Sequence, residues 1–285
     1  NILWLKGYWV SLILFPLFEW VSSNAIFHEA AHFSLNRNKY INYIATYFYS
    51  SIFISPQFWY IQHNIGHHSY SNIPYKDSDL HIVLTKYHYL LKKSNFHPII
   101  QILIIFNFYW LRNFIIIYYV FCNKIKEDLF TIYNSFNYKL FLLDRTFYVG
   151  YFYILPLLLF NLQKAILFIL IPQFVISLLF MINSQITHIH KDCLNVDKDW
   201  YKYQVEVSTN HSPNSFINFI FSGGLNYQIE HHLFPNINHC HFPNIKNIVK
   251  TVCKKYNVKY KEFNGYKDAF MSYYNHLLLM DNLED

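Results

Sequence analysis

The chain has 285 residues, of which 53% are hydrophobic and 21% aromatic, while only 14% are charged. Soluble domains average about 25% charged residues, so this composition excludes an ordinary soluble protein and indicates an integral membrane protein of one domain. The net charge of +6 does not indicate nucleic-acid binding, because the basic residues form no stripe with base-reading elements. Lysines instead follow the last apolar stretch, as in cytosolic segments of membrane proteins, and they include Lys191, Lys198, Lys202, Lys246, Lys250, Lys254 and Lys255.

Apolar stretches follow one another along the chain. Residues 8–27 predict a membrane-spanning helix that leads into a histidine cluster, and residues 141–160 and 165–183 predict two more spans joined as an antiparallel hairpin. Residues 41–60 are apolar and aromatic, and residues 97–121 are apolar but interrupted by Arg112 and Asn113. From about residue 184 to residue 285 the chain is more polar and predicts a cytosolic cap, with a helix-like stretch near 244–256.

Seven histidines fall into three tight clusters, and these clusters are the most informative feature of the sequence. They read His28-Glu-Ala-Ala-His32, His63-Asn-Ile-Gly-His67-His68 and Gln228-Ile-Glu-His231-His232. Neutral imidazole is a common ligand of iron, zinc and copper. One metal ion needs only three or four such groups, so seven of them predict a site for two metals.

The spacing within each cluster suggests which residues act together, because residues four apart share one face of an α-helix. We therefore predict that His28 and His32 grip one ion, and that His63 and His67 form a similar pair. His68 is turned by about a third of a revolution from His67 and is predicted to reach the second ion. The third cluster is predicted to direct Gln228, His231 and His232 to one point.

A shared metal site constrains the topology, because all the clusters must meet on one side of the membrane. The chain between His32 and His63 must then cross the bilayer an even number of times. An apolar run of about 18 residues is too short to cross twice at about 1.5 Å per residue, so residues 41–58 are predicted to lie in the interface. The hairpin at 141–183 already supplies two crossings, so residues 97–121 are predicted to be interfacial as well.

Several residues outside the clusters are candidates for the same site. His188 follows the last predicted span, emerges where the clusters must gather, and is predicted to be a further metal ligand. Polar and acidic residues near the ligands can orient an imidazole or act through water, and the candidates for this role are Glu29, Glu230, Asn183, Gln185, Asp77 and Asp79.

A second class of enzyme is compatible with the first cluster. Residues 28–32 also fit H-E-x-x-H, in which two histidines hold zinc and the glutamate is the general base of a protease. Such a protease needs only one further ligand, and this hypothesis leaves the second and third clusters without a role. Gly223 and Gly224 match no phosphate-binding loop and predict a turn before the helix that carries the third cluster.

The order and spacing of the three clusters resemble the membrane-bound fatty acid desaturases. The segment Gln228-Ile-Glu-His-His-Leu-Phe-Pro235, with glutamine in place of the usual first histidine, resembles the front-end acyl desaturases in particular. Gly223-Gly-Leu-Asn-Tyr-Gln228 and Gln204-Val205 are similar to that group too. The resemblance covers about residues 20–260 and implies an all-α membrane helical bundle with interfacial helices and a cytosolic histidine-rich cap.

The resemblance also implies the chemistry. It implies two non-haem irons and O2 as co-substrate for the desaturation of a fatty acyl lipid or acyl-CoA, at an active site that faces the cytosol from the endoplasmic reticulum membrane of a eukaryote. An acyl hydroxylase or a sphingolipid desaturase would use the same site. The ligands that it implies are His28, His32, His63, His67, His68, His188, Gln228, His231 and His232.

Two departures from the front-end pattern leave the substrate and the position of the double bond open. The first cluster has Glu29 where aspartate is usual, and three residues rather than two separate His63 from His67. Front-end members often carry an N-terminal cytochrome b5 domain with a haem-binding His-Pro-Gly-Gly, which this sequence lacks. We therefore expect an N-terminal truncation or a separate cytochrome b5, with its reductase, as electron donor.

Overall fold

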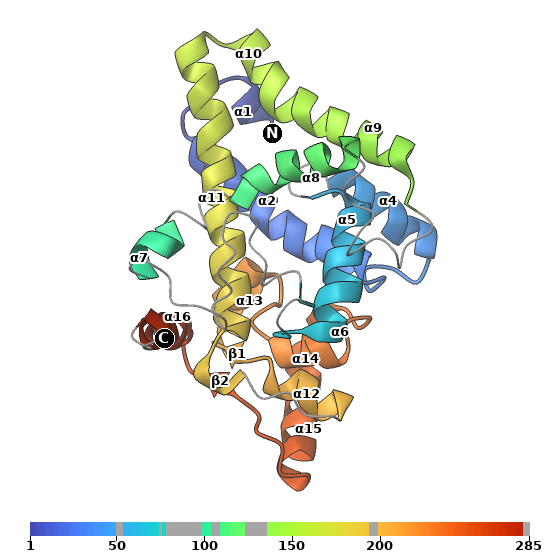
Figure 1. Ribbon diagram of the computed structural model, residues 1–285, viewed down its shortest axis with the longest axis vertical. Helices are drawn as coiled ribbons and strands as arrows, with labels where there is room; N and C mark the ends of the chain where they lie inside the picture. The colour runs from blue at the N-terminus through green and yellow to red at the C-terminus, as the bar shows by residue number, and fades with distance from the viewer. Residues whose placement is uncertain are drawn as a thin grey trace.

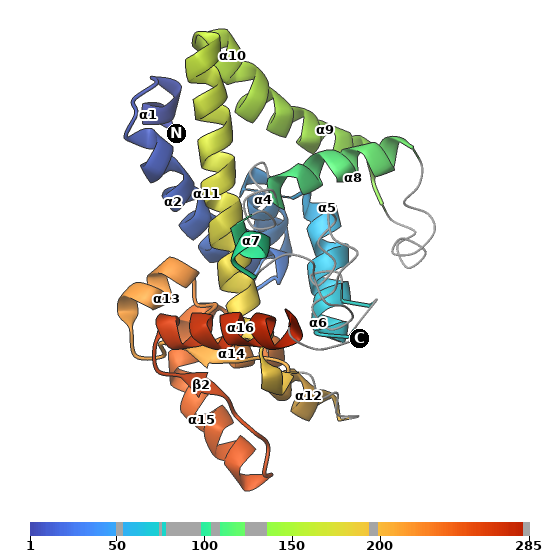
Figure 2. The same cartoon turned by 60° about the vertical axis from the view of Figure 1, so that its left-hand side comes forward.

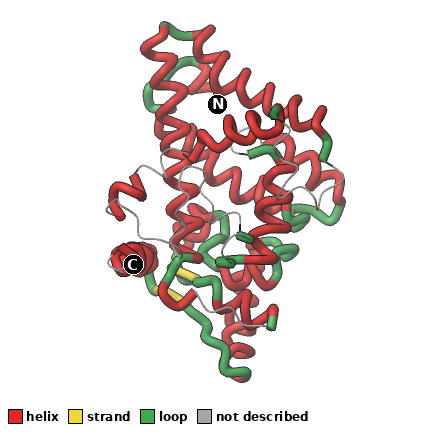
Figure 3. Tube along the Cα trace, viewed as in Figure 1, coloured by secondary structure: helices red, strands yellow, loops and turns green. Residues whose placement is uncertain are grey.

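The computed structural model describes residues 1–49, 54–73, 76–77, 98–103, 109–122, 136–193 and 199–281. Most of this described chain is helical, and its two strands are short (Figure 3). The predicted all-α class is therefore confirmed for these residues. At one end stand the long apolar helices, and at the other lies a cap of shorter helices (Figure 1).

The long apolar helices form the hairpin that the sequence predicts. Its first arm runs through α9 (Tyr138–Val149), the π-helical segment η7 (Gly150–Ile154) and α10 (Leu155–Leu159), and its second arm is α11 (Leu162–His188). Both arms are long and apolar enough to cross a membrane, and no other helix of the described residues meets this test. The turn is short because Asn161 caps α11 by accepting a hydrogen bond from the backbone N–H of Lys164 at 3.0 Å. Helix α11 continues five residues beyond the predicted span, to His188, and the limits of the span itself stay a prediction.

The N-terminal segment packs along this hairpin. It contains α1 (Ile2–Leu5), α2 (Ser11–Ser22), the π-helical segment η1 (Ser23–His28) and α3 (Glu29–Ala31). Helix α2 runs beside α11 (Figure 2), and the indole N–H of Trp4 donates to the carbonyl of Phe168 at 3.1 Å. The residues predicted to span at 8–27 are therefore mostly helical, while their crossing of a membrane stays a prediction.

Helix α4 (Lys39–Tyr49) has the character that an interfacial helix needs. Its apolar side chains Tyr40, Ile44 and Phe48 are exposed, whereas Asn42 and Thr46 are buried against the protein. The predicted interfacial segment 97–121 includes α7 (Pro98–Gln101), the 3-10 turn η5 (Tyr109–Leu111) and α8 (Arg112–Phe121). Interfacial placement of both segments remains a prediction.

The remaining elements form the helix of the second cluster and the cap. The second cluster lies on α5 (Pro56–Trp59), the π-helical segment η3 (Tyr60–His67) and α6 (His68–Tyr70). The cap contains η8 (Lys191–Cys193), α12 (Trp200–Glu206), β1 (Asn210–His211), α13 (Phe216–Ser222), α14 (Gln228–Leu233), η9 (His239–His241), α15 (Phe242–Lys255), β2 (Glu262–Phe263) and α16 (Tyr266–Asp281). Strands β1 and β2 pair in parallel. Helix α15 confirms the helix-like stretch near 244–256, and α16 was not predicted.

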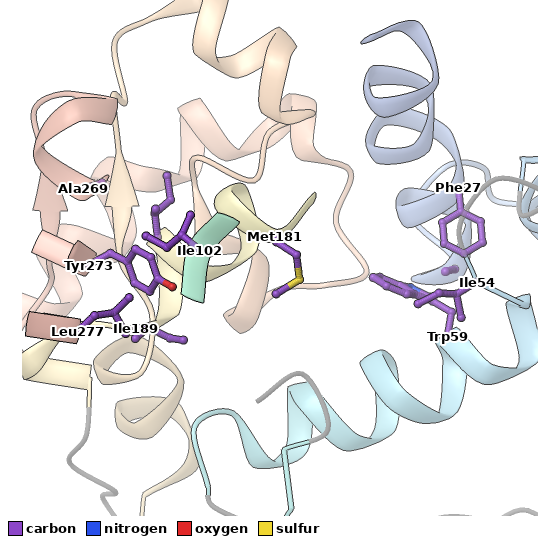
Figure 4. Close-up of a cluster of buried hydrophobic side chains, with 11 residues drawn as sticks. Phe27, Ile54, Trp59, Ile102, Met181, Ile189, Ala269, Tyr273 and Leu277 are labelled. Atoms are coloured by element: carbon purple, nitrogen blue, oxygen red, sulfur yellow. The ribbon is translucent and has the colours of Figure 1, made fainter. Parts of the chain in front are cut away.

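A buried apolar cluster joins the hairpin to the cap. Met181 of α11 lies between Phe27 and Trp59 on one side and the α16 side chains on the other (Figure 4). Tyr273 and Leu277 of α16 pack here with Ile189, which follows α11 directly. Burial of large side chains contributes roughly 1.5–3 kcal/mol each, so this cluster holds the cap-facing end of α11 in place. That end carries His188.

Candidate metal centre

The three histidine clusters converge at the cap-facing end of the helices. The ring centroids of His28 and His231 are 4.6 Å apart, and those of His68 and His232 are 4.5 Å apart. His188 joins them, with its ring centroid 4.7 Å from that of His67. The prediction that the clusters and His188 meet at one place is therefore confirmed.

The histidines form two neighbouring groups in the part of the chain that the structure describes. Within each group, the candidate ligand atoms lie within 4.8 Å of one another. The first group contains His28, His32, His63 and His231, and the second contains His67, His188 and His232. His68 lies between the groups, because its ring centroid is 4.6 Å from that of His32 and 4.5 Å from that of His232.

This arrangement corrects two sequence predictions about partners. His63 and His67 were expected to share an ion, but they belong to different groups. They lie on the π-helical segment η3, whose wider i→i+5 turn changes the directions of residues four apart. His231 and His232 likewise face different groups, so the third cluster does not point to a single ion. The pairing of His28 with His32 in one group agrees with the prediction.

The environment of these rings suits neutral, metal-ligating imidazole. Burial disfavours the protonated ring, and repulsion between neighbouring protonated rings disfavours it further. The pKa therefore lies well below 6.5 for His32, His63, His68, His231 and His232. Nε2 of His32, Nε2 of His231 and both ring nitrogens of His68 are buried without a hydrogen-bond partner. Leaving such atoms unpaired is costly, and a metal ion would satisfy them. The donor set therefore fits two metals that accept imidazole nitrogen.

The second group has a hydrogen-bond acceptor behind every ring. Nδ1 of His67 donates to the Asp77 carboxylate, 3.1 Å from either oxygen. Nδ1 of His188 donates to the carbonyl of Val207 at 3.1 Å, and Nδ1 of His232 donates to Oε1 of Gln204 at 2.9 Å. Each ring therefore keeps its proton on Nδ1 and directs an unprotonated Nε2 toward the centre of the group.

The acidic candidates have different surroundings. Asp77 is fully buried and contacts His67, whereas Asp79 lies outside the described residues. The described side-chain contacts of Glu29 are with residues outside the three clusters. It accepts from Ser34 Oγ at 2.7 Å and pairs with Nδ1 of His239 at 3.2 Å, so nothing in this geometry favours its role as the general base of a zinc protease.

Glu230 is also turned away from the histidines. It accepts from Asn210 Nδ2 at 2.7 Å and from the Tyr260 hydroxyl at 2.9 Å, and its burial raises the pKa of this carboxyl to about 7. These contacts fasten α14 to β1 and to the segment before β2. The described side-chain contacts of Glu29 and Glu230 are with residues outside the three clusters, and a role in orienting the ligating imidazoles stays a prediction.

A cavity adjoins the two histidine groups. Its walls include Trp20, Phe27, Trp59 and Phe180, and His28, His63, His67 and His188 face it. The candidates Asn183, Gln185 and Gln228 are also among its lining residues. The Gln228 amide lies 2.9 Å from Nε2 of His188, whereas Oδ1 of Asn183 is buried without a hydrogen-bond partner. The cavity thus combines apolar walls with polar groups beside the candidate metals.

The turn before the third cluster is a close-packed contact. Gly223 ends α13 in the left-handed conformation with φ +59°, which confirms the predicted turn. A Cβ added there would lie 2.4 Å from Cβ of Asn24, so this glycine allows the cap to approach η1. Segment η1 ends at His28, and the turn therefore helps to bring the first and third clusters together.

Comparison with known proteins assigns the family. The model of the fatty acid desaturases matches residues 3–264. The chain belongs to the fatty acid desaturase family. It is 28% identical to the acyl-lipid omega-13 desaturase of Chlamydomonas reinhardtii, over 95% of this chain and 61% of that protein.

Two further relatives are also named as lipid desaturases. The sn-1 linoleoyl-lipid 6-desaturase of Synechocystis sp. is 28% identical over 89% of this chain and 75% of that protein. The acyl-lipid (8-3)-desaturase B of Dictyostelium discoideum is 28% identical over 98% of this chain and 66% of that protein. The chain therefore spans about three fifths to three quarters of the length of these relatives. No solved structure matches the chain.

The sequence did not single out several residues that surround the second group. Gln204 was noted only for its resemblance to front-end desaturases, and Ser71, Asn72 and Val207 were not noted. Ser71 Oγ donates to the carbonyl of His67 at 2.7 Å. The polar residues directly after the second cluster were a signal in the sequence for side chains that contact this group. Val207 could not be found in this way, because its acceptor is a backbone carbonyl, which any residue type provides.

Proposed function

We propose that this chain desaturates a fatty acyl chain in an O2-dependent reaction of the front-end type, with two non-haem irons in the histidine centre. One observation carries the proposal: buried, neutral imidazoles from three distant clusters form two adjacent groups in a member of the fatty acid desaturase family. The glutamine at position 228 and the names of the Synechocystis and Dictyostelium relatives support the front-end type.

The histidines supply the donors that the metals require. His28, His32, His63 and His231 would hold one iron, and the second group, His67, His188 and His232, would hold the other. His68 lies within reach of both, and Gln228 is adjacent to the second. When bound, a non-haem di-iron centre supplies the dioxygen chemistry needed to oxidise an unactivated C–H bond, for which side chains alone are not sufficient.

The protein itself contributes position and exclusion of water. The methylenes of an acyl chain are chemically alike, so the wall that holds the chain decides which two carbons face the metals. Trp20, Phe27, Trp59 and Phe180 provide apolar walls beside the histidines. Such walls also exclude water from the site.

The same geometry supports a placement in the membrane. The hairpin of α9–α10 and α11 would cross the bilayer, and the exposed apolar face of α4 would lie in its interface. The cap, with its lysines, would then face the cytosol, in the endoplasmic reticulum if the source is eukaryotic. Electrons would come from cytochrome b5 and its reductase, and the substrate would be a fatty acyl lipid or acyl-CoA.

The test is expression of the chain, with a cytochrome b5 donor, in a host that lacks its own desaturase. Lipids are extracted, and each double bond is located by mass spectrometry. A new double bond between an existing one and the carboxyl end is expected, and the His231→Ala variant should not produce it. A hydroxylated acyl chain or an altered sphingoid base would instead favour an acyl hydroxylase or a sphingolipid desaturase. Unchanged lipids, with iron and the donor present, would contradict all three.

A further inference from the structure

Two residues that follow the second cluster, Asn72 and Asp77, connect the hydrogen-bond acceptors of His67 and His188. The backbone N–H of Asn72 donates to Oδ2 of Asp77 at 2.8 Å, which fixes the carboxylate that faces His67. The Asn72 side-chain amide donates to the carbonyl of His188 at 2.9 Å. It also lies 3.3 Å from the carbonyl of Val207, the group that accepts from the His188 ring.

Gln204 is the second anchor of this arrangement. Its side chain is fully buried on α12, accepts from Nδ1 of His232 at 2.9 Å, and donates to the carbonyl of His68 at 2.9 Å. The neighbouring Tyr203 donates from its hydroxyl to the carbonyl of Ser71. One helix of the cap thus links the third cluster to the end of the second cluster.

We propose that Asp77, Asn72 and Gln204 are positioning residues, which set the direction of the three Nε2 atoms in the second group and so determine the affinity of that metal position. This inference rests on the proposed two-metal function. Asn72 has φ +58°, a left-handed conformation that asparagine tolerates better than most residues. Its backbone therefore turns sharply enough for one residue to contact both the carboxylate and the end of α11.

The physical basis is the rigidity and basicity of the ligands. A ring whose Nδ1–H is held by an acceptor cannot turn over or exchange its tautomer, and a carboxylate acceptor makes the other nitrogen a better electron donor to a metal. Loss of such an outer partner typically lowers metal affinity by about 10–100-fold. The first group does not contact Asp77 or Gln204 through the described hydrogen bonds, so the effect should fall on one of the two metals.

The test measures iron binding by the full chain in detergent, with the variants Asp77→Asn and Gln204→Leu. Iron per chain is titrated by elemental analysis, and the environment of each iron is followed by Mössbauer spectroscopy. Gln173→Leu and Asp144→Asn are matched controls, because these side chains are buried in the hairpin away from the histidines. Both test variants should weaken one of the two irons by about 10–100-fold and alter one of the two Mössbauer signals, while the controls keep both.

Each outcome of the iron titration supports or overturns the inference. If both irons keep wild-type affinity, or if both weaken by the same factor, the inference is overturned, because a general loss of structure would affect the two positions alike. If Gln204→Leu does not fold, Gln204→Glu takes its place. The glutamate retains an acceptor for Nδ1 of His232, so this variant should bind the second iron more tightly than Asp77→Asn does. A wild-type chain that binds no iron overturns the proposed function, whereas wild-type binding of two irons with unchanged variants overturns this inference alone.

Discussion

Substitution of Gly223 by alanine tests how closely the cap approaches the helix of the first cluster. Its φ of +59° costs a residue with a Cβ about 1–2 kcal/mol. The added Cβ would lie 2.4 Å from Cβ of Asn24 and 3.1 Å from the backbone carbon of that residue. Overpacking of this kind costs typically 1–3 kcal/mol, so the free energy of unfolding should fall by about 2–5 kcal/mol.

Gly150 is the matched control, because it lies in a helical segment with φ −59° and an added Cβ there meets no atom within 4 Å. Alanine at this position should be neutral or stabilise the helix by about 0.5–1 kcal/mol. The assay is thermal unfolding of the purified chain in detergent, followed by circular dichroism. One kcal/mol corresponds to about 2–4 °C in Tm for a chain near this size, so Gly223→Ala should lower Tm by roughly 4–20 °C.

The same substitution should disturb the metal centre. Asn24 lies on η1, which ends at His28, so displacement of this segment should also lower iron content. The reasoning is refuted if Gly223→Ala and Gly150→Ala unfold at the same temperature. It is also refuted if Asn24→Gly, which removes the opposing Cβ, recovers none of the stability lost in Gly223→Ala.

Three further predictions concern single residues of the cap and the first cluster. His231→Ala should lower iron per chain, measured by elemental analysis, whereas iron content equal to wild type would exclude a ligand role. Burial lowers the pKa of His211 from 6.5 to about 4, so this histidine stabilises the fold fully above pH 6.5. That stability, about 3 kcal/mol, is lost as the pH falls toward 4, and His211→Gln should flatten the acid side of a Tm-against-pH curve. Glu29→Gln should retain both irons with a modest loss of Tm, because Glu29 contacts Ser34 and His239; complete loss of iron would contradict this.

Local spacing was sufficient to predict the elements that carry the site. The apolar lengths at 141–160 and 165–183 predicted the hairpin, since a helix of about 20 apolar residues follows from composition alone. The convergence of His28, His63 and His231 was also predictable, because imidazoles of one metal site must share one side of the membrane. Helix α16 was missed, because its apolar residues are spread around the helix and give no clear face.

The sequence by itself determined the family, the helical class and the set of histidines that meet, since these depend on residue type, hydrophobic length and spacing. Only the tertiary structure decided which histidines are partners. The α-helical period that paired His63 with His67 does not apply in a π-helical turn, and adjacent residues such as His231 and His232 point to different groups. The partners behind the rings were also beyond the sequence: the carbonyl of Val207, the amide of Gln204 and the carboxylate of Asp77 reach the centre only when α12, α11 and the segment after α6 pack together.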